Sequence, residues 1–154
     1  MNEQDLGNIA RTIIDSTMYM VLGTADEYGQ PWVSPVYYAS ARYREFYWVS
    51  SPEVRHSRNI LLRPQISIVI FDSQVPIGTG QGVYMSATTE LLSGADMERG
   101  IASFSETSLK HGGREWTQAD VDPSSPYRLY RATAMEHWVL DPVGRPDHRT
   151  PVTL

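Results

Sequence analysis

The chain has 154 residues, of which 41% are hydrophobic and 20% are charged, and it contains no cysteine. This length and apolar content suit one domain over residues 1–154, and the lack of cysteine excludes disulfides, thiolate metal ligands and iron–sulfur clusters. A formal net charge of -5 at pH 7 argues against nucleic acid as a partner.

The N-terminal segment has the pattern of a short amphipathic helix over residues 3–16. Leu6, Ile9 and Ile13 recur at helical spacing, so one side of this helix is expected to cover the core. The segment lacks the apolar run of a signal peptide, and no stretch approaches the roughly 18 apolar residues of a membrane span. We therefore expect a cytoplasmic protein with no membrane partner.

Short apolar runs separated by turn residues follow this helix. Residues 19–24 and 32–38 flank a turn rich in Asp, Gly and Pro, which predicts a β-hairpin. Residues 46–51 are dense in aromatic and β-branched side chains, which is typical of a third strand.

A helix-start pattern comes next. The oxygen of Ser51 can cap free amide groups, Pro52 suits the first helical position, and the carboxylate of Glu53 complements the helix dipole. The pattern predicts a helix over residues 52–63, which Pro64 ends.

The second half of the chain predicts further strands and one more helix. Residues 66–71 are nearly all apolar and predict a strand buried on both faces. A fifth strand is expected over 83–92, a helix over 95–110, and a last strand or pair of strands over 127–140, followed by a loose tail at 141–154. The result is an α+β domain of mainly antiparallel sheet, whose edges disappear if the sheet closes.

The start of the helix at 52–63 is the best candidate for a ligand site. Free amide groups at a helix N-terminus attract anions, and Arg55, His56, Ser57 and Arg58 add charge and hydrogen-bond donors there. A solvated polar helix face explains the same residues more simply, and the carboxylate of Glu53 would repel a phosphate. The local pattern alone therefore favours the polar face.

Other patterns exclude several chemistries. The glycines at 78–82 precede a strand, so they are not the dinucleotide fingerprint that joins a strand to a helix. The four histidines have no partner at a familiar metal-ligand spacing, so no metal site is expected. No nucleophile elbow, Walker loop or kinase signature occurs.

The order of several weak motifs resembles that of a known family. These motifs are GQPWVSPV at 29–36, FYWVSS at 46–51, HSRNI at 56–60, RPQISI at 63–68 and QGVYMSA at 81–87. Together they resemble the FMN-binding split β-barrels related to pyridoxamine 5′-phosphate oxidase, over about residues 16–140. The resemblance implies a split β-barrel with short flanking helices and a homodimer with FMN at the subunit interface.

The resemblance also implies which residues hold the cofactor. The end of the third strand and the next helix hold the phosphate, the second and third strands line the ring and ribityl chain, and a tryptophan comes from the partner subunit. With this support, the phosphate clamp becomes the preferred interpretation of the helix start. The implied residues are Ser34, Pro35, Val36, Val49, Ser50, Ser51, Arg55, His56, Ser57, Arg58, Gln81 and Trp138.

Departures from the family pattern argue against vitamin B6 as the substrate. The resemblance implies basic residues on the second strand, where this chain has Ser34, Pro35 and Ala39, and a phosphate-binding lysine where it has His56. Because histidine titrates near neutrality, a clamp that relies on it is expected to weaken above about pH 7. We expect an FMN-dependent oxidoreductase of unassigned small-molecule substrate.

Three alternatives remain open. A reductase using the deazaflavin F420 needs a basic groove, for which the candidates are Arg11, Arg42, Arg44 and Arg63. A non-enzymatic flavin- or haem-binding module is the second, with His111 and His137 as candidate haem ligands, and a dimer that binds nothing is the third. No catalytic residue is assigned, although a proton could come from Tyr37, Tyr38 or Tyr84.

Overall fold

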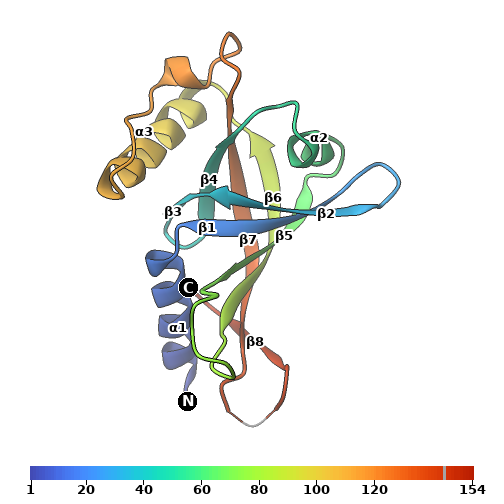
Figure 1. The fold of residues 1–154 in the computed structure, drawn as a ribbon, viewed down its shortest axis with the longest axis vertical. Coiled ribbons are helices and arrows are strands. Elements are labelled where there is room, and N and C mark those ends of the chain that lie inside the picture. The colour runs from blue at the N-terminus through green and yellow to red at the C-terminus, as the bar shows by residue number, and fades with distance from the viewer. Residues whose placement is uncertain (144) are drawn as a thin grey trace.

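The structure, a computed structural model, describes residues 1–143 and 145–154, and within them eight strands form one antiparallel sheet (Figure 1). The strands are β1 (Tyr19–Ala25), β2 (Pro31–Tyr37), β3 (Ala39–Ala41), β4 (Glu45–Ser50), β5 (Gln65–Phe71), β6 (Gly82–Leu91), β7 (Arg128–Leu140) and β8 (Arg149–Val152). The helices are α1 (Glu3–Ser16), α2 (Arg55–Leu62) and α3 (Gly94–Lys110), with a 3-10 turn, η1 (Gln118–Asp120).

The long strand β7 organises the sheet. The strand order is β2-β1-β5-β6-β7-β4-β3, and β7 also pairs with β8 near its C-terminal end. The sheet curls around a core in which the rings of Trp48 and Tyr130 stack with centroids 5.5 Å apart. This is the α+β split β-barrel that the sequence predicted. Among the described residues, no helix is long and apolar enough to cross a membrane.

Helix α1 has the bounds that its periodicity predicted. Asn2 and Asp5 form a capping box, in which the Asp5 amide donates to the Asn2 side chain at 2.8 Å and the Asn2 amide donates to the Asp5 carboxylate at 3.1 Å. Ile14 faces the core, and its carbonyl accepts a hydrogen bond from the buried Tyr38 hydroxyl at 2.7 Å. Tyr38 thus ties the helix to the sheet.

Strand β5 differs from its prediction. Ile66, Ile68 and Ile70 are buried, whereas Ser67 is exposed and Val69 is half-buried. The predicted burial of both faces is wrong because the core lies on only one side of β5, and the second buried cluster covers the other face of the sheet where α3 packs on β3, β4 and β7. The alternation of β5 therefore leaves one face of the sheet open.

The C-terminal half also differs in detail. Residues 128–140 form one continuous strand rather than a pair, and the tail predicted to be loose contains β8. The tail is ordered because Arg149–Val152 pairs with β7 and buries the side chain of Val152. Because Leu140 pairs with Arg149, β7 and β8 form a hairpin, which the four residues of β8 do not predict by their own sequence.

Candidate functional site

Helix α2 begins three residues later than the sequence predicted. The amide of Glu53 donates to the Ser51 hydroxyl oxygen at 3.1 Å, so Ser51 caps a local turn instead of the helix. Val54, which is extended at φ -73 and ψ 158, takes the N-cap position without a side-chain hydrogen bond. The first amide groups of α2, starting at Arg55, thus have no side-chain cap, and such groups favour an anion.

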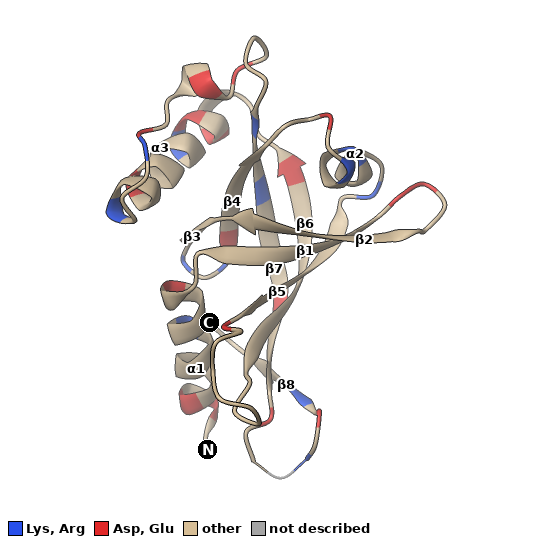
Figure 2. Cartoon of the chain, in the orientation of Figure 1, with Lys and Arg blue, Asp and Glu red and all other residues tan. Residues whose placement is uncertain are grey.

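Two arginines flank this helix start. The Arg55 guanidinium lies 4.1 Å from the centre of the Trp32 ring, in a cation–π contact that holds it beside β2. Arg58 is exposed one turn further along. Neither arginine takes part in an ion pair within the described residues. Figure 2 shows basic residues in blue on α2.

His56 and Ser57 contribute differently from what the sequence suggested. His56 Nε2 lies 3.0 Å from the Ser50 hydroxyl, and burial lowers the pKa of His56 below its usual 6.5. His56 is therefore neutral at pH 7 in the free protein, and the pH dependence of the clamp stays a prediction. Ser57 is fully buried, and its Oγ lies beside the Tyr130 hydroxyl without a well-formed hydrogen bond.

The other predicted residues are spread over two strands and beyond. On β2, Ser34 and Val36 turn into the core and Pro35 faces outward. On β4 and just after it, Val49, Ser50 and Ser51 are half-buried beside the start of α2.

The side-chain amide of Gln81 forms hydrogen bonds to the backbone of its own chain. Its Nε2 donates to the Leu140 carbonyl at 2.9 Å, and its Oε1 accepts from the Leu140 amide at 2.7 Å and the Gly82 amide at 2.9 Å. The side chain thus ties the start of β6 to the end of β7. It lines one cavity with α1 and another with residues 140–142 and 145–147, and no clamp residue lines either cavity.

The open face of the sheet carries a row of large side chains. In register across β2, β1, β5, β6 and β7, this row comprises Pro35, Val21, Val69, Tyr84 and Trp138. The neighbouring row contains the small residues Gly23, Ser67 and Ser86, and a Cβ on Gly23 would lie only 2.6 Å from the Ser67 hydroxyl oxygen. The two rows form a groove of about 410 Å³ that can accept a flat ring.

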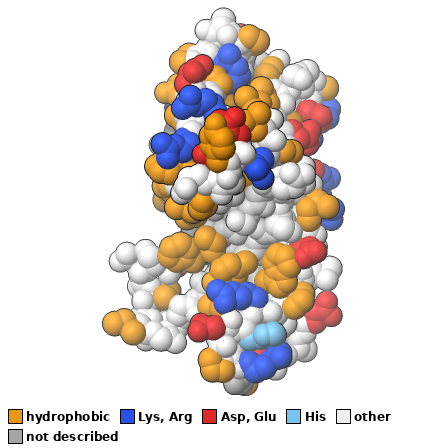
Figure 3. Space-filling view, turned by 90° about the vertical axis from the view of Figure 1, so that its right-hand side faces the viewer, with side chains coloured by type: hydrophobic (Ala, Val, Ile, Leu, Met, Phe, Trp, Pro, Cys, Tyr) orange, Lys and Arg blue, Asp and Glu red, His pale blue; other side chains and the backbone are white. Residues whose placement is uncertain are grey.

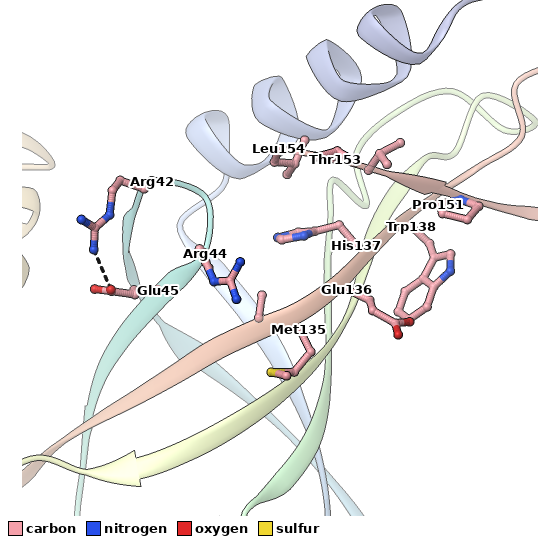
Figure 4. A pocket seen from close by; sticks show the side chains of 12 residues that line it. Arg42, Arg44, Glu45, Met135, Glu136, His137, Trp138, Pro151, Thr153 and Leu154 are labelled. Carbon is pink, nitrogen blue, oxygen red and sulfur yellow. Dashed lines mark hydrogen bonds and ion pairs between the residues drawn. The ribbon is translucent and has the colours of Figure 1, made fainter.

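A larger cavity of about 750 Å³ lies on the other side of Trp138 (Figure 4). Arg42 is held there by Glu45 at 2.7 Å, whereas Arg44 turns toward β7 without an ion partner in the described part of the chain. His137 Nε2 donates to the Tyr43 carbonyl at 2.7 Å, and the pKa of His137 is lowered by burial. Trp138 lines both this cavity and the groove.

The four arginines proposed to bind the acidic tail of F420 do not all line one cavity. Arg42 and Arg44 line the same cavity, and the Arg11 guanidinium lies 5.8 Å from the ring of the intervening Tyr43. Arg63 instead donates to the Glu27 carbonyl at 3.2 Å, in the turn between β1 and β2.

Comparison with known proteins identifies the family. A family model described as pyridoxamine 5′-phosphate oxidase matches residues 8–140. The chain belongs to the pyridoxamine 5′-phosphate oxidase-like family. No curated protein sequence gives a significant match to this family member.

Several solved structures share the fold of this pyridoxamine 5′-phosphate oxidase-like chain. HutZ, the haem storage protein of Vibrio cholerae, is 18% identical with a TM-score of 0.66, and the match covers 84% of this chain and 89% of HutZ. A haem-binding protein of Mycobacterium smegmatis is 21% identical with a TM-score of 0.71, and the match covers 93% of this chain but 55% of that protein. An F420 reductase is 12% identical with a TM-score of 0.62, and the match covers 83% and 94%.

Two features of this family member escaped the sequence patterns. Trp32 lies inside the GQPWVSPV motif at 29–36, but its contact with Arg55 depends on how β2 and α2 pack. The Tyr37 hydroxyl lies 2.6 Å from His111 Nδ1 although the two residues are 74 positions apart. Neither contact leaves a local signal in the sequence.

Proposed function

We propose that this chain is an FMN-binding oxidoreductase that acts on a small-molecule substrate as a homodimer. The observation that carries this proposal is the start of α2, where uncapped amide groups and two arginines without ion partners converge. A chain with a net charge of -5 that keeps two free cations at one helix end is suited to a single anionic group.

In this proposal, each part of the clamp has a separate role. Arg55 and Arg58 supply charge, Ser57 contributes its backbone amide, and His56 acts as a neutral hydrogen-bonding group together with Ser50. The Trp32 ring orients Arg55 before the ligand arrives, which reduces the entropy lost on binding. Ser51 lies at the same junction between β4 and α2.

Strands β2 and β4, which lie beside the start of α2, border the flavin ring in this proposal. Pro35 offers its side chain, Ser34 and Val36 offer backbone groups, and Val49 lies half-exposed on β4. FMN supplies the hydride or electron chemistry itself when bound. The chain's residues orient the ring and exclude water, and Trp138 of a second copy closes the site. Gln81 acts by holding the strand ends that border it.

Exposed apolar residues support the homodimer. On the open face, the side chains of Val33 and Phe71 are 68% and 46% exposed, and Figure 3 shows hydrophobic side chains between charged ones over much of one side of the molecule. An apolar sheet face of this kind is stabilised when another surface covers it. A second copy of the chain is the simplest cover, because it also brings Trp138 to the cofactor.

A titration with FMN tests the proposal. The change is Arg55→Ala/Arg58→Ala, and the control is Arg99→Ala/Lys110→Ala, which removes the same charge from ion pairs on α3. Two charge-assisted hydrogen bonds, each worth roughly 1.5–3 kcal/mol, predict at least about a 100-fold loss of affinity in the first variant. The control should stay within about threefold. Equal affinities in the two variants, or no FMN binding, would contradict the proposal.

F420 is the alternative cofactor. The observation that favours it is the cavity with Arg42 and Arg44, which shares the wall formed by Trp138 with the groove and could hold an acidic tail. One of the similar structures is also an F420 reductase. If F420 is the cofactor, Arg44→Ala should weaken F420 binding about tenfold or more and leave FMN binding unchanged.

A haem-binding module is a further alternative. Two of the similar structures are haem proteins, and His111 has an exposed ring in an aromatic pocket, whereas His137 is half-buried and bonded to the backbone. Adding haem should then produce a Soret band that is lost in His111→Ala. The absence of such a band would eliminate this alternative.

A further inference from the structure

A separate cavity of about 360 Å³ lies where the end of α3 meets the start of β1 and the end of β2. The Tyr37 ring is at its centre, with centroids 5.9 Å from Tyr19, 5.6 Å from Phe104 and 5.8 Å from His111, each at a steep angle. Trp116 extends the wall, 5.6 Å from Phe104. Edge-to-face aromatic walls of this kind suit a flat aromatic occupant.

One polar pair stands within these walls. The Tyr37 hydroxyl lies 2.6 Å from His111 Nδ1. In the tautomer that carries the ring proton on Nε2, the Tyr37 hydroxyl donates to Nδ1, and this tautomer is part of the inference. His111 is exposed, and its Nε2 has no hydrogen-bond partner among the described residues. The cavity thus offers one oriented donor.

The cavity has no free charge for an anion. The Arg114 guanidinium stacks 4.1 Å from the centre of the Trp116 ring and pairs with Asp120 at 2.7 Å. Lys110, at the end of α3, pairs with Glu106 at 3.3 Å. The C-terminal end of α3 also carries a partial negative charge toward this region. An uncharged occupant is therefore favoured over an anionic one.

We infer that this cavity is a binding site for a flat, uncharged aromatic molecule of one or two rings, whose hydrogen-bond acceptor takes the proton of His111 Nε2. Its volume lies in the range of small-ligand sites. Tyr19 and Tyr37 are a register pair on the open face, two residues from Val21 and Pro35, so the occupant lies next to the groove. That it is the substrate of the oxidoreductase rests on the proposed function.

The experiment compares chromone with naphthalene. The two bicyclic molecules have nearly the same shape, but chromone carries a ring carbonyl that can accept from His111. Cofactor-free protein is titrated with each ligand by saturation-transfer NMR and calorimetry. We expect chromone to bind with a submillimolar Kd, about fivefold more tightly than naphthalene, because one additional hydrogen bond contributes roughly 1 kcal/mol.

Three variants assign the contacts. His111→Phe keeps an aromatic ring and removes the donor, so the preference for chromone should disappear. Trp116→Leu removes part of the wall and should weaken both ligands by tenfold or more. Tyr28→Ala removes an 87% exposed aromatic residue far from the cavity and should change neither affinity. Circular dichroism confirms that each variant is folded, and if Trp116→Leu does not fold, the exposed His111 position carries the test alone.

Each outcome decides the proposal. No saturable chromone binding, or an unchanged preference in His111→Phe, overturns it. Saturable binding with the preference lost in His111→Phe supports it. FMN and F420 titrations of the same preparation report on the cofactor separately. Flavin binding without chromone binding contradicts this inference alone. Chromone binding without binding of FMN or F420 contradicts the proposed function alone.

Discussion

Replacing Ser57 by alanine should stabilise the protein. The Ser57 side chain is 0% exposed, and its Oγ has no hydrogen bond within the described residues. A buried hydroxyl without a partner costs about 1–3 kcal/mol of desolvation. Removing it while leaving a small cavity should raise the free energy of unfolding by about 1 kcal/mol, which corresponds to a rise in Tm of about 2–4 °C for a chain of this size.

Urea and thermal unfolding at one fixed protein concentration measure this change, since a dimer's stability depends on concentration. A cycle with Tyr130→Phe should give a coupling energy near zero. A destabilisation of about 1 kcal/mol together with positive coupling to Tyr130 would refute the reasoning, because it would mean that the two hydroxyls form a real hydrogen bond. The affinity for FMN should stay within about threefold, since Ser57 is proposed to act through its amide.

Three further results are expected. Burial lowers the pKa of His56 and His137 below 6.5, so the unfolded state binds protons at higher pH than the folded state. The free energy of unfolding, measured from pH 8 to pH 5, should therefore be constant above about pH 6.5 and fall below it. The fall should be less steep in a variant in which both histidines are replaced by glutamine. Tyr38→Phe deletes a buried hydrogen bond to the end of α1 and should cost about 1–2 kcal/mol in urea unfolding, and no loss would contradict the bond. Trp32→Ala releases Arg55 and should weaken the affinity for FMN about 2–5-fold in a fluorescence titration. An unchanged affinity would mean that the ring contact does not orient Arg55 for binding.

Local patterns predicted most of the fold. Helix α1 was predicted at its observed bounds because its apolar residues repeat at helical spacing. The hairpin of β1 and β2 was predicted because its strands and turn are contiguous in the chain. Such elements depend on residues within a few positions of one another, which a single sequence displays.

The errors arose where a local pattern had two physical outcomes. Ser51 was interpreted as a helix cap, but its hydroxyl is used by the nearer amide of Glu53. The apolar run of β5 was interpreted as buried on both faces, but the exposed Ser67 within it lies on the open face of the sheet. Strand β8 forms only because β7 provides an edge for it.

The candidate site was predictable where its residues are contiguous. The segment from Ser50 to Arg58 forms one junction between a strand and a helix. The groove around Gly23 and the cavity around Tyr37 depend on strand register and on where α3 ends. Those depend on contacts between distant segments, which no local pattern encodes.

Sedimentation velocity with FMN, followed at the visible flavin band, tests the central claim most directly. The account predicts that the flavin sediments with a species of about twice the chain mass of 17.4 kDa, at one FMN per chain, and that it no longer does so in Arg55→Ala/Arg58→Ala. Flavin that stays unsedimented, or that sediments equally well with this variant, would contradict it.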